Sequence, residues 1–192
     1  NVIEEKIKIP EGYNVVYSGQ FESEAAATRT LVLASIGALI IILILLYMEF
    51  HDIKESLIIL VNMPLAMIGG VLMLRLTSGE LNIPAIIGFI SLLGITTRNG
   101  MLLISRYNSL HNDGLALSER ILKGSSDRLL PIIMTALTSA LALAPLALRG
   151  GDPGNELQSP MAIVILGGLL TSTLLNIFVI PILYYYVQHR KK

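Results

Sequence analysis

Five apolar stretches, each about as long as a membrane-spanning helix, restrict what this chain can fold into. The hydrocarbon core of a bilayer is about 30 Å thick, so an α-helix rising about 1.5 Å per residue needs about 20 apolar residues to cross it. We expect spans at about residues 30–48, 56–75, 84–105, 129–148 and 160–186. Charged residues make up 15% of the chain, against about 25% in average soluble domains. The sequence therefore predicts an all-α membrane protein and excludes an ordinary soluble globule.

The basic residues orient these spans, because cytoplasmic loops of membrane proteins are rich in Lys and Arg. If the first span runs inward, the inner side contains Lys54, Arg106, Arg120, Lys123, Arg128, Arg190, Lys191 and Lys192, and the two short outer loops contain Arg75 and Arg149. We therefore expect the N-terminus outside the membrane and a cytoplasmic tail at residues 188–192.

The region before the first span has a different pattern. Residues 1–21 contain apolar residues on both sides of a Pro10–Glu11–Gly12 turn, which predicts a short extracytoplasmic arm of strands and loop. So short an arm cannot bury a core of its own, and we expect it to end a larger domain. From Glu22 the chain has no Gly or Pro until Gly37. This pattern predicts a helix that starts outside the membrane and continues into the first span.

A further short helix is predicted on the inner side of the membrane. Residues 114–122 combine apolar with charged side chains, which is typical of an amphipathic helix lying along the interface. Gly124 would cap its C-terminus, and Ser125 or Ser126 would cap the helix that follows.

Arg98 lies well inside the third span. A charge near the centre of an isolated spanning helix costs at least about 2.5 kcal/mol, so Arg98 is expected to face the bundle interior and meet carboxylates or water. Snorkelling to the inner boundary near Arg106 is the alternative, but it would cover about 12 Å of helix, which is long for this side chain. Because a guanidinium stays protonated in proteins, Arg98 could hold or release a carboxylate but could not itself release a proton.

Small and polar residues surround Arg98. Ser91, Gly94 and Ser105 lie on roughly the same helical face, and such a face permits close helix approach or hydration. We place Asn99 and Thr135 near the same site, although Thr135 could instead bond to a carbonyl of its own helix. No carboxylate lies inside any of the five spans. The partner of Arg98 is therefore expected elsewhere.

The last span contains small residues spaced for helix packing. Gly167, Gly168 and Ser172 form overlapping small-xxx-small pairs with their neighbours, as do residues around Gly69 and Gly70 in the second span. In a membrane such residues let two helices approach closely. We therefore assign them to packing and not to a substrate site.

Several classes of function lack the residues they need. The chain has no Cys, and its three His residues lie at cytoplasmic edges without forming a ligand cluster, so we predict no metal site and no cofactor. No phosphate-binding loop is present. Lys plus Arg and Asp plus Glu both number 14, so no basic excess indicates nucleic acid. These observations favour a non-enzymatic membrane protein.

Three segments resemble the resistance-nodulation-division (RND) efflux pumps. They are GFISLLGITTRNGMLLIS, LLPIIMTALTSALALAPLAL and PMAIVILGGLLTSTLLNIFVIPILYYYV. The resemblance covers essentially the whole chain and implies the last five of twelve spans of a proton-driven permease. Residues 1–21 then look like the end of the periplasmic porter domain, and residues 22–187 form the five-helix bundle. The run beginning GNELQSP looks closest to the heavy-metal branch, which implies export of metal ions or small toxic compounds.

The resemblance also implies roles for individual residues. The drug-exporting branch has a Lys in a K-N-A pattern on its tenth span, and Arg98, Asn99 and Gly100 stand at the matching positions. The family's neighbouring span has a Thr in an M-T-S context, which Thr135 matches. These resemblances imply that Arg98, Asn99 and Thr135 belong to a proton relay whose carboxylates lie in the N-terminal half of the permease.

The implied partners are that N-terminal half, further copies in a homotrimer, a periplasmic adaptor, an outer-membrane channel and membrane lipid. The implied location is a bacterial inner membrane. The residues alone leave open a different class, a noncatalytic membrane scaffold or lipid-handling assembly subunit in which Arg98 merely ties helices together.

Overall fold

The structure is a computed structural model that describes residues 20–77, 81–150, 152 and 154–190. These residues form five helices and no strand: α2 (Gln20–Phe50), α3 (Ile53–Thr77), α4 (Ile83–Asn112), α5 (Leu117–Leu148) and α6 (Gln158–His189). Each helix is long and apolar enough to cross a membrane. The predicted all-α architecture of five spans is thereby confirmed. The predicted arm of strands falls almost entirely outside the described residues, as does the end of the predicted tail.

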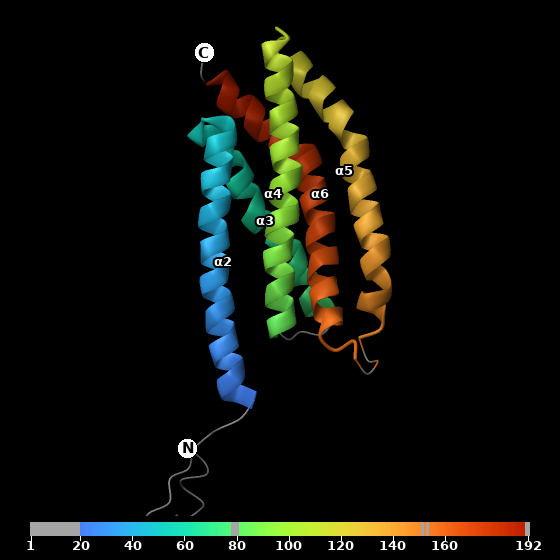
Figure 1. Cartoon of the computed structure of the whole chain (residues 1–192). Helices are drawn as coiled ribbons and strands as arrows, with labels where there is room; N and C mark the ends of the chain where they lie inside the picture. Colours follow the sequence, from blue (N-terminus) through green and yellow to red (C-terminus); the bar gives the residue numbers. More distant parts are fainter. Residues whose placement is uncertain (1–19, 78–80, 151, 153, 191–192) are drawn as a thin grey trace, which may run out of the picture.

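Successive helices run in opposite directions (Figure 1). The α2–α3 and α4–α5 connections lie at one end of the bundle together with the C-terminal end of α6. The basic residues predict this end to be cytoplasmic. The α5–α6 connection and the first residues of α2 lie toward the opposite end.

Glycines bring α3 and α6 into the most extensive helix contact of the bundle. Gly69 of α3 meets Gly167 of α6, and a Cβ on either residue would collide with the backbone carbonyl of the other. Gly168 faces α4, where a Cβ would overlap the side chain of Leu92. Helices in lipid gain stability mainly from such close packing, because the surrounding acyl chains are as apolar as the helices. The centre of the bundle is therefore an α3–α4–α6 unit.

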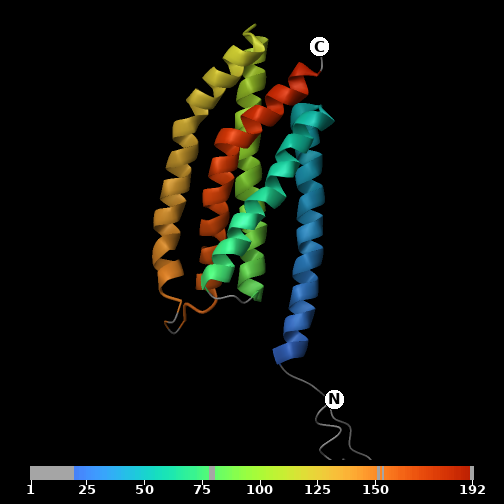
Figure 2. The same ribbon diagram turned by 180° about the vertical axis from the view of Figure 1, so that it is seen from behind.

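One face of α4 packs against this centre and the opposite face stays open. Its buried residues include Ala85, Phe89, Leu92, Thr96, Asn99, Leu103 and Tyr107. Figure 1 shows α3 and α6 behind α4, with α2 and α5 to its two sides, and Figure 2 shows the same helices from the opposite side, with α3 and α6 in front. The flanking helices are less buried within this chain, since 6% of the apolar window of each is buried, against 50% for α4. The open face of α4 therefore lies between two helices that this chain leaves mostly exposed.

The start of α5 differs from the sequence prediction. There is no separate helix ending at Gly124, because α5 begins at Leu117 and continues through this glycine without a break. A Cβ at position 124 would lie 2.6 Å from Cδ1 of Tyr107 on α4. Ser125 does not cap a helix either, since its Oγ lies in hydrogen-bond contact with the Tyr107 hydroxyl at 2.6 Å. The glycine thus marks a close crossing of α4 and α5.

The start of α2 agrees with its prediction. The helix begins at Gln20, ahead of the first apolar span, and continues to Phe50. A helix that starts ahead of the first span is thereby confirmed.

Candidate functional site

A stripe on the open face of α4 contains Arg98. The exposed residues Ile87, Ser91, Gly94, Arg98 and Leu102 recur at intervals of three or four, which places them on one side of a helix. No helix among the described residues covers this stripe. The sequence argument placed Arg98 toward a bundle interior, and within this chain its side chain is exposed. An interior position therefore requires protein outside the described helices.

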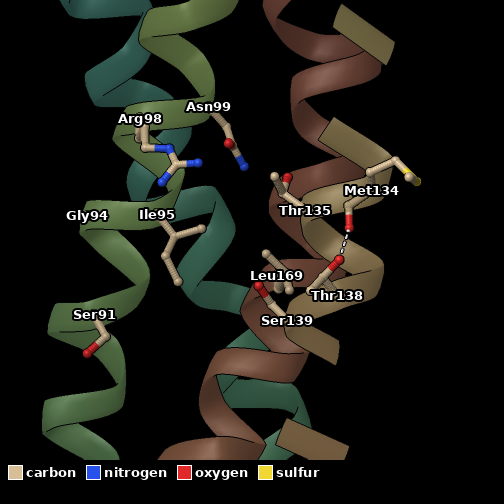
Figure 3. Close-up of a pocket in the computed structure, with 10 residues that line it drawn as sticks. All are labelled: Ser91, Gly94, Ile95, Arg98, Asn99, Met134, Thr135, Thr138, Ser139 and Leu169. Atoms are coloured by element: carbon tan, nitrogen blue, oxygen red, sulfur yellow. Dashed lines mark hydrogen bonds between the residues drawn. The ribbon is translucent and has the colours of Figure 1, made fainter. Parts of the chain in front are cut away.

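A pocket of about 570 Å³ lies beside the stripe, between α4 and α5. It is lined by Ser91, Gly94, Ile95, Arg98, Asn99, Met134, Thr135, Thr138, Ser139 and Leu169. Figure 3 shows the Arg98 guanidinium and the Asn99 amide extending from α4 toward α5. The pocket thus combines a permanent positive charge, an amide and several hydroxyl groups with apolar walls. This arrangement suits water and a carboxylate better than an apolar ligand.

Arg98 has no counter-charge among the described residues. It forms no ion pair or hydrogen bond with any of them. Nearby, Arg106 of α4 does pair with Asp127 of α5, with Nη2 and Oδ2 2.6 Å apart. Because an unpaired guanidinium is unfavourable in the hydrocarbon region, the site is electrostatically incomplete in this chain.

Asn99 and Thr135 border the same pocket as Arg98. The Asn99 side chain is buried, and its Nδ2 has no hydrogen-bond partner among the described residues. The Thr135 hydroxyl donates to the carbonyl of Ile132 on its own helix, at 2.9 Å. The local bond considered from the sequence is therefore present, and it leaves the lone pairs of Thr135 able to accept a further hydrogen bond. The structure brings all three predicted relay residues to one pocket.

Arg128 is a site residue that the sequence analysis missed. A smaller pocket of about 90 Å³ is lined by Arg98, Asn99, Leu102, Arg128, Pro131, Ile132 and Thr135. Two guanidinium-bearing residues from neighbouring helices therefore border one small space. Along the sequence Arg128 stands at the inner boundary of its span, where a basic residue is expected to orient the helix. Its spacing of seven residues from Thr135, which places both on one face of α5, was the signal that could have found it.

Glu49 lies beside a further pocket next to Arg98. This pocket, of about 320 Å³ between α2 and α4, is lined by both residues. Glu49 is exposed near the end of α2, and the two form no ion pair. Along the sequence Glu49 stands at a membrane boundary, and only the packing of α2 against α4 brings it to the same pocket as Arg98.

The four residues predicted to pack helices do not all lie at helix contacts. Gly167 and Gly168 lie at the contacts described above. Ser172 is fully buried, and its hydroxyl donates to the Leu169 carbonyl at 3.2 Å. Gly94, in contrast, has nothing within 4 Å of where its Cβ would lie. A packing role for Gly94 thus remains a prediction about a helix outside the described part. No group of three or more His, Cys, Asp or Glu residues that could hold a metal occurs within the described ranges.

Comparisons with known proteins agree with this architecture. A family model described as the AcrB/AcrD/AcrF family matches residues 1–188. The cobalt-zinc-cadmium resistance protein CzcA of Cupriavidus metallidurans is 38% identical over 189 residues, which cover 98% of this chain and 18% of CzcA. The nickel-cobalt-cadmium resistance protein NccA of Alcaligenes xylosoxydans xylosoxydans is 36% identical over 187 residues, covering 97% of this chain and 17% of NccA.

A solved structure matches as well. The X-ray crystal structure of a heavy metal efflux pump has a TM-score of 0.81 and 32% identity, covering 97% of this chain and 18% of that one. The chain thus spans less than a fifth of the length of these relatives. Because the family model covers nearly the whole chain and the helices superpose on a pump of this type, the predicted resemblance is confirmed and the chain belongs to the AcrB/AcrD/AcrF family of RND transporters.

Proposed function

We propose that this chain forms the C-terminal membrane half of a proton-driven permease that exports metal ions or small toxic compounds. Membership of an RND family favours transport over the scaffold or lipid-handling subunit that the residues alone leave open. Metal ions are the first substrates to test, because the matched relatives are named for resistance to cobalt, zinc, cadmium and nickel.

The observation that carries the proposal is the unpaired Arg98 on the open stripe of α4. A polar pocket and a permanent charge within a membrane span are expensive in lipid and are typical of ion or proton pathways in membrane proteins. The described helices supply no counter-charge to Arg98. We therefore place the partner carboxylate on a helix of the N-terminal half, packed against the stripe. Gly94 leaves room on this stripe for such a helix to approach closely.

In the proposed mechanism, Arg98 is a fixed charge that responds to a carboxylate which gains and loses a proton. The ionised carboxylate pairs with Arg98, and protonation removes its charge and weakens the pair. The two states then favour different helix arrangements, and this difference can be coupled to extracytoplasmic domains. Asn99 and Thr135 offer hydrogen bonds on the proton path, and Arg128 adds a second positive charge beside it.

We extend the proposal to partners and location. The permease would span a bacterial inner membrane as a homotrimer, contacting lipid, a periplasmic adaptor and an outer-membrane channel. Residues 1–21 would end its porter domain. These assignments rest on family membership, and a size measurement of the purified full-length protein in detergent tests the trimer.

Transport by Arg98 variants of the complete permease tests the proposed function. Full-length protein in liposomes is given an imposed pH gradient and Zn²⁺, and Zn²⁺ movement is followed with a trapped fluorescent indicator. Arg98→Ala is expected to reduce gradient-driven movement to background, because the carboxylate loses its counter-charge. Arg98→Lys keeps a positive charge without the planar fork, and partial activity is expected.

Arg75→Ala is the matched control, since Arg75 is an exposed arginine in the last turn of α3. It is expected to transport at the wild-type rate. Wild-type transport by Arg98→Ala with intact proton dependence would show that the embedded charge is structural, and the proposed mechanism would be wrong.

A further inference from the structure

A second polar cluster lies inside the bundle, on the far side of α4 from the open stripe. Asn62 of α3 donates through Nδ2 to Oδ1 of Asn176 on α6, at 2.9 Å, and both residues are 0% exposed. Thr96 of α4 is also 0% exposed. These side chains come from the three helices that form the centre of the bundle.

Two sets of contacts between α3, α4 and α6, here called layers, place Asn62, Thr96 and Asn176 at one level along the bundle axis. In the first layer, a Cβ added to Gly100 of α4 would lie 3.4 Å from Ile59 of α3 and 3.3 Å from Ile180 of α6. Asn62 follows Ile59 by three residues, whereas Thr96 and Asn176 precede Gly100 and Ile180 by four. Because α3 runs opposite to α4 and α6, all three residues lie about one turn, roughly 4.5–6 Å, along the same direction.

The second layer brackets the cluster from the other side. There a Cβ added to Gly70 of α3 would lie 2.9 Å from the Phe89 ring of α4 and 3.2 Å from Cγ1 of Val164 on α6. Between the two layers, Asn62 of α3 lies at the level of Thr96 on α4 and Asn176 on α6. The cluster is therefore enclosed by apolar side chains on both sides along the bundle axis.

Each member of this cluster has a buried polar atom without a hydrogen-bond partner among the described residues. These atoms are Oδ1 of Asn62, Oγ1 of Thr96 and Nδ2 of Asn176. The adjacent Thr97 differs, because its hydroxyl donates to the Leu93 carbonyl at 2.6 Å. Buried polar groups without partners are unfavourable and are usually satisfied by protein or ordered water.

We propose that Asn62, Thr96 and Asn176 hold an internal water molecule at the α3–α4–α6 junction. Water would donate to Asn62 Oδ1, accept from Asn176 Nδ2 and exchange a hydrogen bond with the Thr96 hydroxyl. Three such bonds are the usual number for a buried water. The chemistry of the unpartnered atoms, an acceptor, a donor and a hydroxyl that is both, matches what water offers.

Asn99 connects this hydration site to the Arg98 pocket. It lies less than one turn from Thr96 on α4, and its own Nδ2 is buried without a partner among the described residues. It also lines the Arg98 pocket. Polar side chains therefore continue around α4 from Arg98 on the open stripe, by way of Asn99, to Thr96 at the α3–α6 contact. The consequence for transport rests on the proposed function, whereas the water site rests on the geometry alone.

The test is a structure of the full-length permease in lipid, at a resolution that shows ordered water. Wild-type density is expected to contain a peak at hydrogen-bond distance from the three unpartnered atoms. Thr96→Val keeps the shape of the side chain and removes its hydroxyl, so the peak is expected to disappear. Thr96→Ser keeps the hydroxyl and is expected to keep the peak. Thr173→Val on α6 is the control, because its hydroxyl is already bonded to the Leu169 carbonyl.

Transport measurements distinguish a failure of this inference from a failure of the proposed function. In the Zn²⁺ assay, Thr96→Val is expected to slow gradient-driven movement about fivefold, with Thr96→Ser and Thr173→Val at the wild-type rate. A dry cluster, in which the two amides rotate to donate to each other, would overturn the water site. Density that disappears in Thr96→Val with unchanged transport would overturn the connection to the pocket. Wild-type protein without gradient-driven transport would instead contradict the proposed function, and the density would still decide the water site.

Discussion

The hydroxyl of Tyr184 donates a 2.8 Å hydrogen bond to Oδ1 of Asn108 and so ties α6 to α4. Nδ2 of Asn108 donates in turn to Glu55 of α3 at 2.6 Å, and Gln188 of α6 donates to the other oxygen of Glu55 at 2.9 Å. The guanidinium carbon of Arg120 on α5 lies 5.7 Å from the centroid of the Tyr184 ring. This network joins four helices at the end of the bundle that is predicted to be cytoplasmic.

Tyr184→Phe is expected to destabilise the full-length protein by about 1 kcal/mol, because the half-buried Asn108 Oδ1 loses its donor. Thermal unfolding in detergent measures it. Tyr185→Phe is the control, since Tyr185 is 46% exposed. Equal melting temperatures for the two variants would mean that the network adds no stability.

Gly167→Val is expected to disrupt the α3–α6 contact. Its Cβ would collide with the backbone carbonyl of Gly69, which cannot move aside like a flexible side chain. We expect a loss of about 3 kcal/mol or more. Gly37→Val on α2 provides the comparison, because nothing lies within 4 Å of a Cβ at that position. Wild-type unfolding of Gly167→Val would contradict the close contact between the two helices.

Arg128→Gln is expected to slow proton-driven Zn²⁺ transport by the complete permease about tenfold, equal to about 1.4 kcal/mol in the barrier. The reason is the loss of one of two positive charges beside the small pocket that contains Asn99 and Thr135. The control on the same helix is Arg149→Gln, at the exposed C-terminal cap of α5. If both variants transport equally, Arg128 serves orientation in the membrane and not the relay.

The predicted orientation can be tested by single-cysteine labelling in a full-length background from which every other Cys has been removed, since these 192 residues contain none. Cysteines at Leu81 and Asp152 of the full-length protein are expected to react with a membrane-impermeant maleimide added outside intact cells. A cysteine at Asn112 is expected to react only after permeabilisation. All three positions are exposed in the structure. Labelling of position 112 from outside would reverse the orientation.

The sequence predicted the number and order of the helices because the hydrophobic requirement of a bilayer is local along the chain. Its error at the start of α5 has a tertiary cause. Glycine ends many helices, but Gly124 is needed where Tyr107 crosses. A single sequence does not distinguish these two reasons for a glycine.

The candidate site was predictable only where its residues stood out along the sequence. Arg98 did so because it is a charge within a span. Arg128 was overlooked because it stands at a span boundary, where basic residues are common. The pair of Asn62 and Asn176 was not predicted, since the two residues are 114 positions apart and each alone resembles an isolated polar residue. Their relationship depends on the α3–α6 register.

The uneven burial of the five helices has a mechanical consequence. The three central helices are joined by backbone contacts at glycines and should move as one stiff body. α2, by contrast, is 31 residues long, about 46 Å at the usual rise, and only 6% of its apolar window is buried. Among residues 26–50 only Leu46, near the C-terminal end of α2, is buried, so the described helices anchor α2 near one end. A tilt about this anchor displaces the opposite tip of α2 most, by a distance that grows with the length of the helix.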